Sequence, residues 1–311
     1  MGDVIVNSAT ITLKDHGGGV YGSANPSVAL DTPDLVLDGF ETGDLTAPNS
    51  GDGVNTIGFS WDSTNGTSIA NKTTVIYNFS GVVSIPLVNP DPDDWDPQTG
   101  DNSFRVYYGP ADDWSEQRFD TTTPQTSLYV GYWIMVPTNY TRVNDGPQNN
   151  NKWFDIFWGN IAGWPTDYSN SNLPRLEMQD IAGSAGACNM QMQVRQQGAG
   201  TIQTSSSHSD FITEADAGRW MHCMYYLGES SGTDVADAEV KFWRRWEDDA
   251  GYTLICSLDS LVIQNTVGEG VNGWSGGYLM GFLNDPFVDA SVWMIDDFSW
   301  WSTDPTSGVL P

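Results

Sequence analysis

Basic side chains are scarce in this chain of 311 residues, which has 12 Lys and Arg against 40 Asp and Glu and a formal net charge of −28. So acidic a surface repels the phosphates of nucleic acids and the head groups of anionic membranes. The sequence also lacks an uninterrupted apolar run of about 18 residues, which a membrane-spanning helix needs. We therefore expect no nucleic-acid partner and no insertion into a membrane.

Cysteine and targeting signals are equally sparse. The three cysteines, Cys188, Cys223 and Cys256, form no C-x-x-C pair, so we expect no zinc site, at most one disulfide and mainly buried free thiols. The first ten residues have neither the basic nor the apolar region of a secretory signal. A virion protein is released by cell lysis and needs no such signal, so the absence favours a virion-surface location over an extracellular, secreted one.

Helical periodicity is nearly absent, and only residues 213–217 have the pattern of a helical turn. β-branched and aromatic runs recur instead between clusters of Gly, Pro, Asn and Asp, and 14 Trp, 12 Tyr and 12 Phe enrich the chain in strand formers. This pattern predicts an all-β protein with strands near residues 5–13, 35–40, 74–79, 103–108, 128–136, 152–158, 175–179, 189–196, 219–227, 239–246, 261–264, 277–283 and 292–301.

Two of these expected strands alternate polar and apolar side chains, as a strand does when its two faces meet different environments. A slip of one residue in register would bury two glutamines and an arginine without partners. We therefore predict one sheet with a polar outer face and an apolar face against a core. The predicted polar face comprises Arg175, Glu177, Gln179, Gln191, Gln193, Arg195 and His222, and the core beneath it Met190, Met192 and Val194.

Two short segments far apart in the chain carry a more specific signal, DGFETGDL at residues 38–45 and WMIDDFS at residues 293–299. They resemble the first and last strands of concanavalin A-like jelly rolls, a superfamily that includes carbohydrate-binding modules and polysaccharide lyases. In that superfamily the two strands lie side by side and hold a structural calcium ion between them. The resemblance implies a calcium site, and turn formation with solvated strand ends is the other interpretation of the same residues. The implied ligands are Glu41, Asp44, Asp296 and Asp297.

The resemblance covers most of the chain. It implies a jelly-roll β-sandwich over residues 34–304, preceded by an N-terminal arm or extra strand at 1–33 and followed by a C-terminal tail at 305–311. Because the arm is rich in Gly and contains the strand-forming segment 5–13, we expect it to pair with another copy of the protein.

Related jelly-roll families include lyases that cleave uronate polymers such as alginate and glucuronan by β-elimination. That reaction needs a group that neutralises the uronate carboxylate and a base that takes the C5 proton. The strand RLEMQ at 175–179 resembles the R-x-E-L-R strand of alginate lyases, with Gln in place of the last Arg. The implied site comprises Arg175, Gln193, Arg195, His222 and Tyr226.

Several motifs of such enzymes are missing from the sequence: the Y-F-K-x-G-x-Y strand, the Q-I-H or Q-V-H tripeptide, and the E-x-D-x-x-E pair of laminarinase-like glycosidases. A cross-strand ion-pair ladder explains Arg175, Glu177 and Arg195 equally well. An ordinary strand histidine explains His222.

Four tryptophans stand in turn-rich segments beside Asp, Asn and Gly: Trp95, Trp114, Trp164 and Trp274. Indole rings in such surroundings stack on sugar rings while polar neighbours hydrogen-bond the hydroxyl groups. These residues are therefore predicted to bind carbohydrate, and the other interpretation is that they plug the ends of the sandwich.

The missing enzyme motifs, the absent export signal and the arm favour a protein that binds and assembles. We predict a non-enzymatic, calcium-stabilised protein of a virion surface, as a capsid decoration or a fibre component. Its expected partners are other copies in the assembly and surface glycans. The alternative is a secreted polysaccharide lyase that cleaves uronate polymers of the alginate or glucuronan type by β-elimination.

Overall fold

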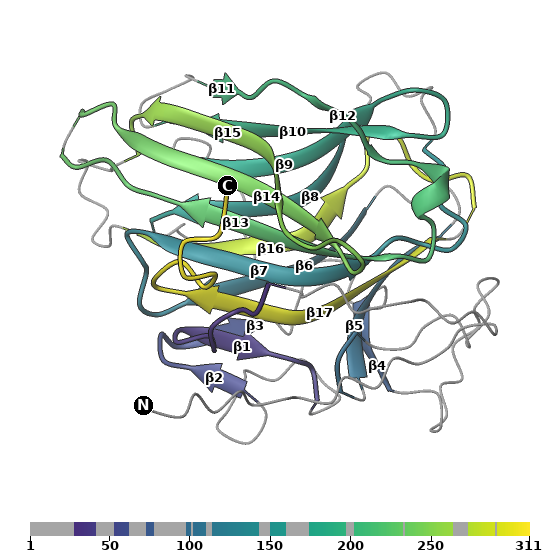
Figure 1. Cartoon of the computed structure of the whole chain (residues 1–311), viewed down its shortest axis with the longest axis horizontal. Coiled ribbons are helices and arrows are strands. Elements are labelled where there is room, and N and C mark those ends of the chain that lie inside the picture. Colours follow the sequence, from purple (N-terminus) through teal and green to yellow (C-terminus); the bar gives the residue numbers. More distant parts are fainter. Residues whose placement is uncertain are drawn as a thin grey trace, which may run out of the picture.

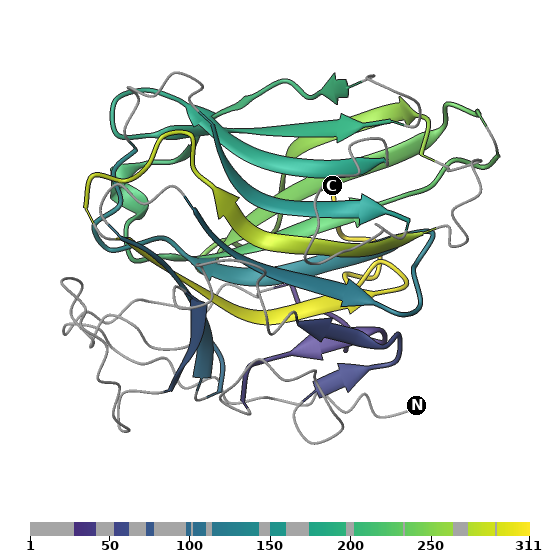
Figure 2. The same cartoon turned by 180° about the vertical axis from the view of Figure 1, so that it is seen from behind.

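The computed structural model of the chain describes residues 28–41, 53–61, 73–77, 98–100, 102–109, 114–142, 150–159, 174–196, 202–232, 234–263, 273–289 and 291–311. They form two antiparallel β-sheets packed as a sandwich (Figure 1 and Figure 2). The predicted all-β sandwich is confirmed. The strand predicted at residues 5–13 lies outside the described residues.

The first sheet has nine strands in the order β15-β14-β13-β7-β17-β1-β2, and β5 joins it through β17 with β4 beyond. β1 pairs with β17, so the first and last strands of the sandwich lie side by side as predicted. The strands are β1 (Val36–Asp38), β2 (Gly53–Asn55), β4 (Thr73–Tyr77), β5 (Asn102–Tyr108), β7 (Leu128–Met135), β13 (Trp220–Leu227), β14 (Ala238–Trp246), β15 (Thr253–Leu261) and β17 (Ser291–Trp301).

The second sheet has eight strands in the order β11-β10-β9-β8-β16-β6-β3, with β12 paired to β10. Figure 2 shows its longer strands bending across the molecule. The strands are β3 (Phe59–Trp61), β6 (Trp114–Thr121), β8 (Asn150–Trp158), β9 (Arg175–Ala182), β10 (Cys188–Arg195), β11 (Ile202–Thr204), β12 (His208–Ile212) and β16 (Trp274–Phe282).

The core lies between the two sheets. Met190, Met192 and Val194 of β10 are fully buried in it, which confirms the register predicted for that strand. Aromatic rings fill much of the remaining space, and the ring of Tyr225 stacks on that of Phe154 with centroids 4.6 Å apart. All three cysteines are free and buried.

A single turn of 3₁₀-helix, η2 (Glu214–Asp216), falls within the segment whose sequence predicts a helical turn. The Asp216 carboxylate accepts a hydrogen bond from the backbone N–H of Thr213 at 2.9 Å and so caps the turn. Among the described residues, no helix has the length and apolar character needed to cross a membrane.

The two ends of the described chain meet on the outer face of the nine-stranded sheet, where Figure 1 places the C-terminus. The Asp31 N–H donates to the carbonyl of Pro305 at 2.7 Å, and Trp301 Nε1 donates to the carbonyl of Asp31 at 2.8 Å. Farther along, Trp243 Nε1 donates to the carbonyl of Pro311 at 3.0 Å. The chain therefore covers part of this face itself, while the domain boundaries at residues 33 and 304 stay predictions.

Within the described residues, five strands lie outside the predicted ranges, β2, β3, β6, β11 and β12, and β15 begins before the predicted range 261–264. Residues 261–264 do not form a strand of their own, because β15 ends at Leu261. β6 is absent from the predicted strands, since its sequence WSEQRFDT is polar at most positions. Every second residue of β6 nevertheless points inward: Ser115, Gln117 and Phe119 are fully buried.

Candidate functional site

Five polar side chains form a row across the outer face of the eight-stranded sheet. Along this row Gln193 stands opposite Glu177, and Glu177 opposite Asp155. Asp155 in turn stands opposite Tyr278, and Tyr278 opposite Arg118. The row therefore brings an amide, two carboxyl groups, a phenol and a guanidinium from five strands onto one line.

A pocket of about 220 Å³ lies at the Arg118 end of this row. It is built where β8, β16 and β6 run side by side. Arg118 and Lys152 place two cations in it, although the chain as a whole is strongly acidic. The lining residues are Trp114, Glu116, Arg118, Lys152, Tyr278 and Phe282.

Two aromatic rings lie at one end of the pocket. Trp114 begins β6 and stands directly opposite Phe282 of β16. Directly opposed residues on neighbouring strands point to the same face of a sheet, so the two rings lie together. Phe282 is 37% exposed, a large fraction for a phenylalanine, and it presents an apolar surface to a ligand in the pocket.

A glycine allows two side chains of the pocket to approach each other. Gly281 has a φ of +156°, and Met280 before it is left-handed with a φ of +58°. A Cβ atom at Gly281 would lie 3.0 Å from the ring of Tyr278 and 3.3 Å from the Cβ atom of Lys152. This irregular piece of β16 backbone leaves the space in which Lys152 and Tyr278 meet.

The hydroxyl of Tyr278 stands between a cation and a carboxyl group. Lys152 Nζ donates to Tyr278 Oη at 3.4 Å, and Tyr278 Oη donates to Asp155 Oδ2 at 2.9 Å. Glu177 Oε2 lies 3.0 Å from Lys152 Nζ and 3.1 Å from Arg175 Nη2, which fixes both cations above the sheet. A phenol held in this way can give a proton to one neighbour and take one from another.

Asp155 lies at the centre of the row and is fully buried. Burial raises its pKa to about 7; Arg175 and Lys152 lower it and Glu177 raises it further. The side chain therefore changes its protonation close to neutral pH.

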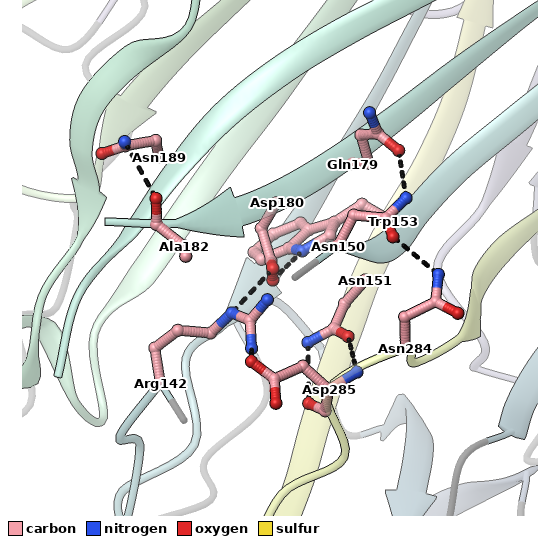
Figure 3. Close-up of polar contacts among 10 residues, drawn as sticks. All are labelled: Arg142, Asn150, Asn151, Trp153, Gln179, Asp180, Ala182, Asn189, Asn284 and Asp285. Carbon is pink, nitrogen blue, oxygen red and sulfur yellow. Dashed lines mark hydrogen bonds and ion pairs between the residues drawn. The ribbon is translucent and has the colours of Figure 1, made fainter. Parts of the chain in front are cut away.

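A buried polar cluster closes one end of the same sheet (Figure 3). The guanidinium of Arg142 pairs with Asp180, at 2.9 Å, and with Asp285. Trp153 Nε1 also donates to Asp180 at 2.9 Å, and Asn151 exchanges hydrogen bonds with both backbone groups of Asp285. The cluster thus ties the segments that carry Arg142 and Asp285 to β8 and β9.

A chain of amide side chains leads from this cluster across the outer face (Figure 3). Asn284 Nδ2 donates to Asn150 Oδ1 at 2.6 Å, and Asn150 Nδ2 donates to Gln179 Oε1 at 2.5 Å. Gln179 Nε2 then donates to Gln191 Oε1 at 3.1 Å. The predicted polar face of β9 and β10 is therefore confirmed, and its side chains are held in place by one another.

The residues implied by the lyase resemblance are divided between the two sheets. Arg175, Gln193 and Arg195 lie on the outer face of the eight-stranded sheet as expected. His222 and Tyr226 belong to β13, which pairs with β7 and β14 in the nine-stranded sheet. The prediction that His222 shares a face with the other polar residues is therefore wrong, because alternation along a strand does not tell which sheet the strand joins.

His222 is instead a buried histidine on the outer side of the nine-stranded sheet. Its Nδ1 atom shares a hydrogen bond of 2.9 Å with the hydroxyl of Tyr252, and its ring packs edge-on against Trp133. Burial, with a smaller contribution from Arg245, lowers the pKa of His222 well below its usual value. Its surroundings are those of an ordinary strand histidine.

The four tryptophans predicted to bind carbohydrate have different environments. Trp114 belongs to β6 rather than to a loop, and it lines the pocket. Trp274 lies in β16, is fully buried and packs edge-on against Trp158 with ring centroids 5.4 Å apart, so its predicted contact with sugar is wrong. Trp95 and Trp164 lie outside the described residues.

Three of the four predicted calcium ligands lie close together at the junction of β1 and β17. Thr99 donates from its N–H to Asp296 and from its hydroxyl to Asp297. Glu41 lies against Gly100. The pKa of Asp297 is raised, first by burial and further by the negative charge of Glu41. Within the described part of the chain no group of three or more His, Cys, Asp and Glu side chains is spaced to hold a metal ion, and Asp44 falls outside that part.

No protein-family model matches the chain, and no curated protein matches it either. Several solved structures, in contrast, match the chain. A PL-14 alginate lyase from Aplysia kurodai is 12% identical, with 66% of this chain and 85% of that chain covered and a TM-score of 0.47. The alginate lyase Aly36B is 16% identical, with 68% and 86% covered and a TM-score of 0.46. Alginate lyase vAL-1 from Chlorella virus is 10% identical, with 77% and 97% covered and a TM-score of 0.44.

Sequence reasoning missed Arg118, Lys152 and Tyr278. The signal that marks Arg118 is the alternation in β6, where the aromatic and charged residues Trp114, Glu116 and Arg118 occupy every second position. Lys152 is one of only 12 basic residues in the chain. Tyr278 gives no such signal, because only the pairing of β16 with β6 and β8 brings it to the pocket.

Proposed function

We propose that this chain is a polysaccharide lyase that cleaves a uronate-containing polysaccharide by β-elimination on the outer face of the eight-stranded sheet. The observation that carries the proposal is the meeting of Arg118, Lys152 and Tyr278 in one pocket. β-Elimination needs a cation beside the uronate carboxylate, a base for the C5 proton and an acid for the leaving oxygen. The pocket contains one residue for each of these tasks.

Each of the three residues has a distinct role in the proposed reaction. Arg118, oriented by its 2.5 Å contact with Glu116, neutralises the uronate carboxylate and so acidifies the C5 proton. Tyr278 Oη takes that proton as its own proton leaves along the hydrogen bond that the phenol donates, and the electron pair of the broken C–H bond forms the C4=C5 double bond. The C4–O4 bond breaks as the ammonium of Lys152 gives a proton to O4, which leaves an unsaturated uronate and a new chain end.

The direct test is incubation of the protein with alginate, glucuronan and heparin while the absorbance of the unsaturated product is followed. A rise with one of the polymers is expected. If the absorbance stays constant with all three polymers although the protein binds one of them, the elimination proposal is wrong and the predicted non-enzymatic glycan binding is favoured.

The aromatic end of the pocket predicts a contact with a neighbouring sugar ring. Replacing Trp114 with Ala should raise KM about tenfold, which corresponds to about 1.4 kcal/mol of lost stacking, and should change kcat little. Trp114→Phe should keep most of the affinity, because a flat ring remains. If Trp114→Ala lowered kcat with KM unchanged, the ring would contribute to the chemical step instead of binding a neighbouring sugar.

We also propose that Glu41, Asp296 and Asp297 take part in a calcium site, as the jelly-roll resemblance implies. The chemistry of the donors fits, because calcium binds carboxylate oxygens, but their spacing does not, so binding would have to draw the three carboxylates together. Burial, together with the charge of Asp297, raises the pKa of Asp296 to about 8, so these carboxyl groups are costly to ionise without a cation. Thr99 and Ser103 donate hydrogen bonds to Asp296.

This arrangement predicts how stability depends on pH and calcium. The pKa of Asp296 is higher in the folded than in the unfolded chain, so its contribution to stability is complete below about pH 4 and is lost as the pH rises toward about 8. In chelator, the melting temperature of the wild type should fall more over this range than that of Asp296→Asn. Calcium at a hundredfold excess over its Kd should restore about 2.7 kcal/mol at pH 8.

The surface variant Asp259→Asn is the control for this experiment, because Asp259 is exposed at the far edge of the nine-stranded sheet. It should leave both the pH response and the calcium response unchanged. Equal melting temperatures of the wild type in calcium and in chelator at pH 8 would contradict the calcium proposal.

The predicted virion-surface location, the assembly with other copies through the arm at residues 1–33 and the role of a coat protein stay predictions. A lyase acts on polymers outside the cell, so the proposed function goes with the alternative extracellular location. Truncation to a chain that starts at Pro33 should leave the pocket intact and so preserve lyase activity, whereas it should remove any assembly that depends on the arm.

A further inference from the structure

Asp155 lies directly beneath the Tyr278 hydroxyl but does not line the pocket. Its Oδ2 atom accepts the phenol hydrogen bond at 2.9 Å, and its Oδ1 atom is buried without a hydrogen bond to a described residue. Arg175 Nη1 is 3.9 Å from Oδ2, too far for a hydrogen bond. Among the described residues, the phenol is therefore the hydrogen-bond partner of this buried carboxyl group.

We infer that Asp155 is a positioning residue for the proposed elimination, which orients the Tyr278 hydroxyl and takes its proton as Tyr278 removes the C5 proton of the substrate. The inference rests on the proposed function. Asp155 cannot reach the sugar itself, because its side chain is fully buried, so it acts only through Tyr278. Its sheet partners Tyr278 on one side and Glu177 on the other fix its position in the row.

The proton and electron transfers balance in this step. The C5–H bond breaks, its proton passes to Tyr278 Oη, and the proton that Oη carried passes to Asp155 Oδ2. The electron pair from C5 forms the C4=C5 double bond, the C4–O4 bond breaks, and O4 takes a proton from Lys152. Asp155 ends protonated and Lys152 neutral, so one proton returned from Asp155 to Lys152 through Tyr278 or solvent restores the starting state.

The charged groups around Asp155 keep it able to accept a proton near neutral pH. Lys152 lies on its own strand, Arg175 and Glu177 on β9, and Tyr278 on β16, with Arg118 beyond Tyr278 on β6. Burial has the largest influence and raises the pKa of Asp155 to about 7. Arg175 and Lys152 favour the ionised carboxylate and lower this pKa, whereas Glu177 raises it. Above that pH the carboxylate is ready to accept; below it Asp155 already carries a proton and cannot.

The first test replaces Asp155 with Asn, which keeps the shape and a hydrogen-bond acceptor but cannot take the proton. We expect kcat at pH 8 to fall on the order of 10²-fold with KM unchanged. The wild-type kcat should rise as the pH passes through about 7, and Asp155→Asn should lack this rise.

The matched control is Asp120→Asn, which changes a partly buried acid of β6 and should keep the wild-type pH profile of kcat. An Asp155→Asn enzyme that keeps the rise near pH 7 would overturn the inference.

The second test asks whether Asp155 acts through the phenol. In a Tyr278→Phe background, Asp155→Asn should cause no further loss of kcat, because the group through which it works is gone. Losses that multiply in the double variant would show that Asp155 acts independently of Tyr278 and would overturn the inference.

The third test does not depend on activity. The infrared difference between the wild type and Asp155→Asn isolates the C=O band of protonated Asp155, which should titrate near pH 7. In Tyr278→Phe the midpoint should rise, because the phenol hydrogen bond lowers the pKa of Asp155. If the wild type is active and the midpoint is the same in Tyr278→Phe as in the wild type, the inference about Asp155 is wrong and the proposed function stands. If the midpoint rises in Tyr278→Phe but the wild type is inactive on every polyuronate, Asp155 and Tyr278 are coupled and the proposed function is wrong.

Discussion

Replacing Tyr278 with Phe should lower kcat on a cleavable polyuronate by about 10²–10⁴-fold, the usual contribution of a positioned acid or base. The variant loses only the hydroxyl, which bridges Lys152 and Asp155, and keeps the ring that fills the space beside Gly281. KM should therefore change little. Lys152→Met should give a loss of similar size, because it keeps the aliphatic stem and removes the proton donor.

Two controls on the opposite sheet separate this prediction from a general effect on the protein. Tyr226→Phe removes the hydroxyl of a tyrosine on β13 whose ring packs at a tilt against that of Tyr129, and Lys241→Met removes a lysine on β14 that pairs with Glu239. Both variants should keep wild-type kcat and KM. If Tyr226→Phe abolished the activity and Tyr278→Phe did not, the active site would lie on the nine-stranded sheet and the proposed site would be wrong.

The sequence was sufficient to predict which side chains share a face within β9 and β10. Their polar and apolar residues alternate, and burying Gln191, Gln193 or Arg195 without partners would cost more than any gain from a shifted register. The structure shows this arrangement, with Met190 and Met192 fully buried beneath. Pairing of the first and last strands was also predictable, since the resemblance to jelly rolls concerned both of them.

The pocket was not predictable because its residues come together only through strand pairing. Lys152 and Tyr278 are more than 120 residues apart, and β16 lies between β8 and β6 although it follows both by more than 100 residues in sequence. Alternation gives the two faces of a strand but not its neighbours. For the same reason His222, whose strand has the right alternation, was assigned to the wrong sheet.

Trp274 shows a second limit of sequence reasoning. Glycines and polar residues surround it in sequence, which favours a loop, yet β16 runs through the middle of the eight-stranded sheet. Gly277, three residues farther along β16, is required by packing, because a Cβ atom there would lie 2.1 Å from the carbonyl oxygen of Asp155. Glycine in a central strand can thus mark close approach of a neighbouring strand as well as a turn.

The largest expected loss of stability follows from replacing Arg142 with Met. Its side chain is fully buried and its guanidinium pairs with both Asp180 and Asp285, themselves 2% exposed at their side chains (Figure 3). Removing the guanidinium takes this cation away from two buried carboxylates, and breaking a buried pair in this way costs about 3–5 kcal/mol. Denaturant unfolding at pH 8 should show this loss as a lower midpoint with an unchanged slope.

Arg219 provides the matched control, because it too bridges two aspartates, Asp216 and Asp248, but its side chain is 31% exposed. Arg219→Met should cost only about 0–1 kcal/mol, since solvent screens such pairs. The deficit of Arg142→Met should shrink as the pH falls, because the carboxyl group of Asp180, whose pKa burial raises, then takes up a proton and loses its charge. Two results would contradict this prediction: equal losses of unfolding free energy in the two variants, or a loss in Arg142→Met that is the same at pH 5 and pH 8. Either would mean that lost packing, and not uncompensated charge, sets the stability of this cluster.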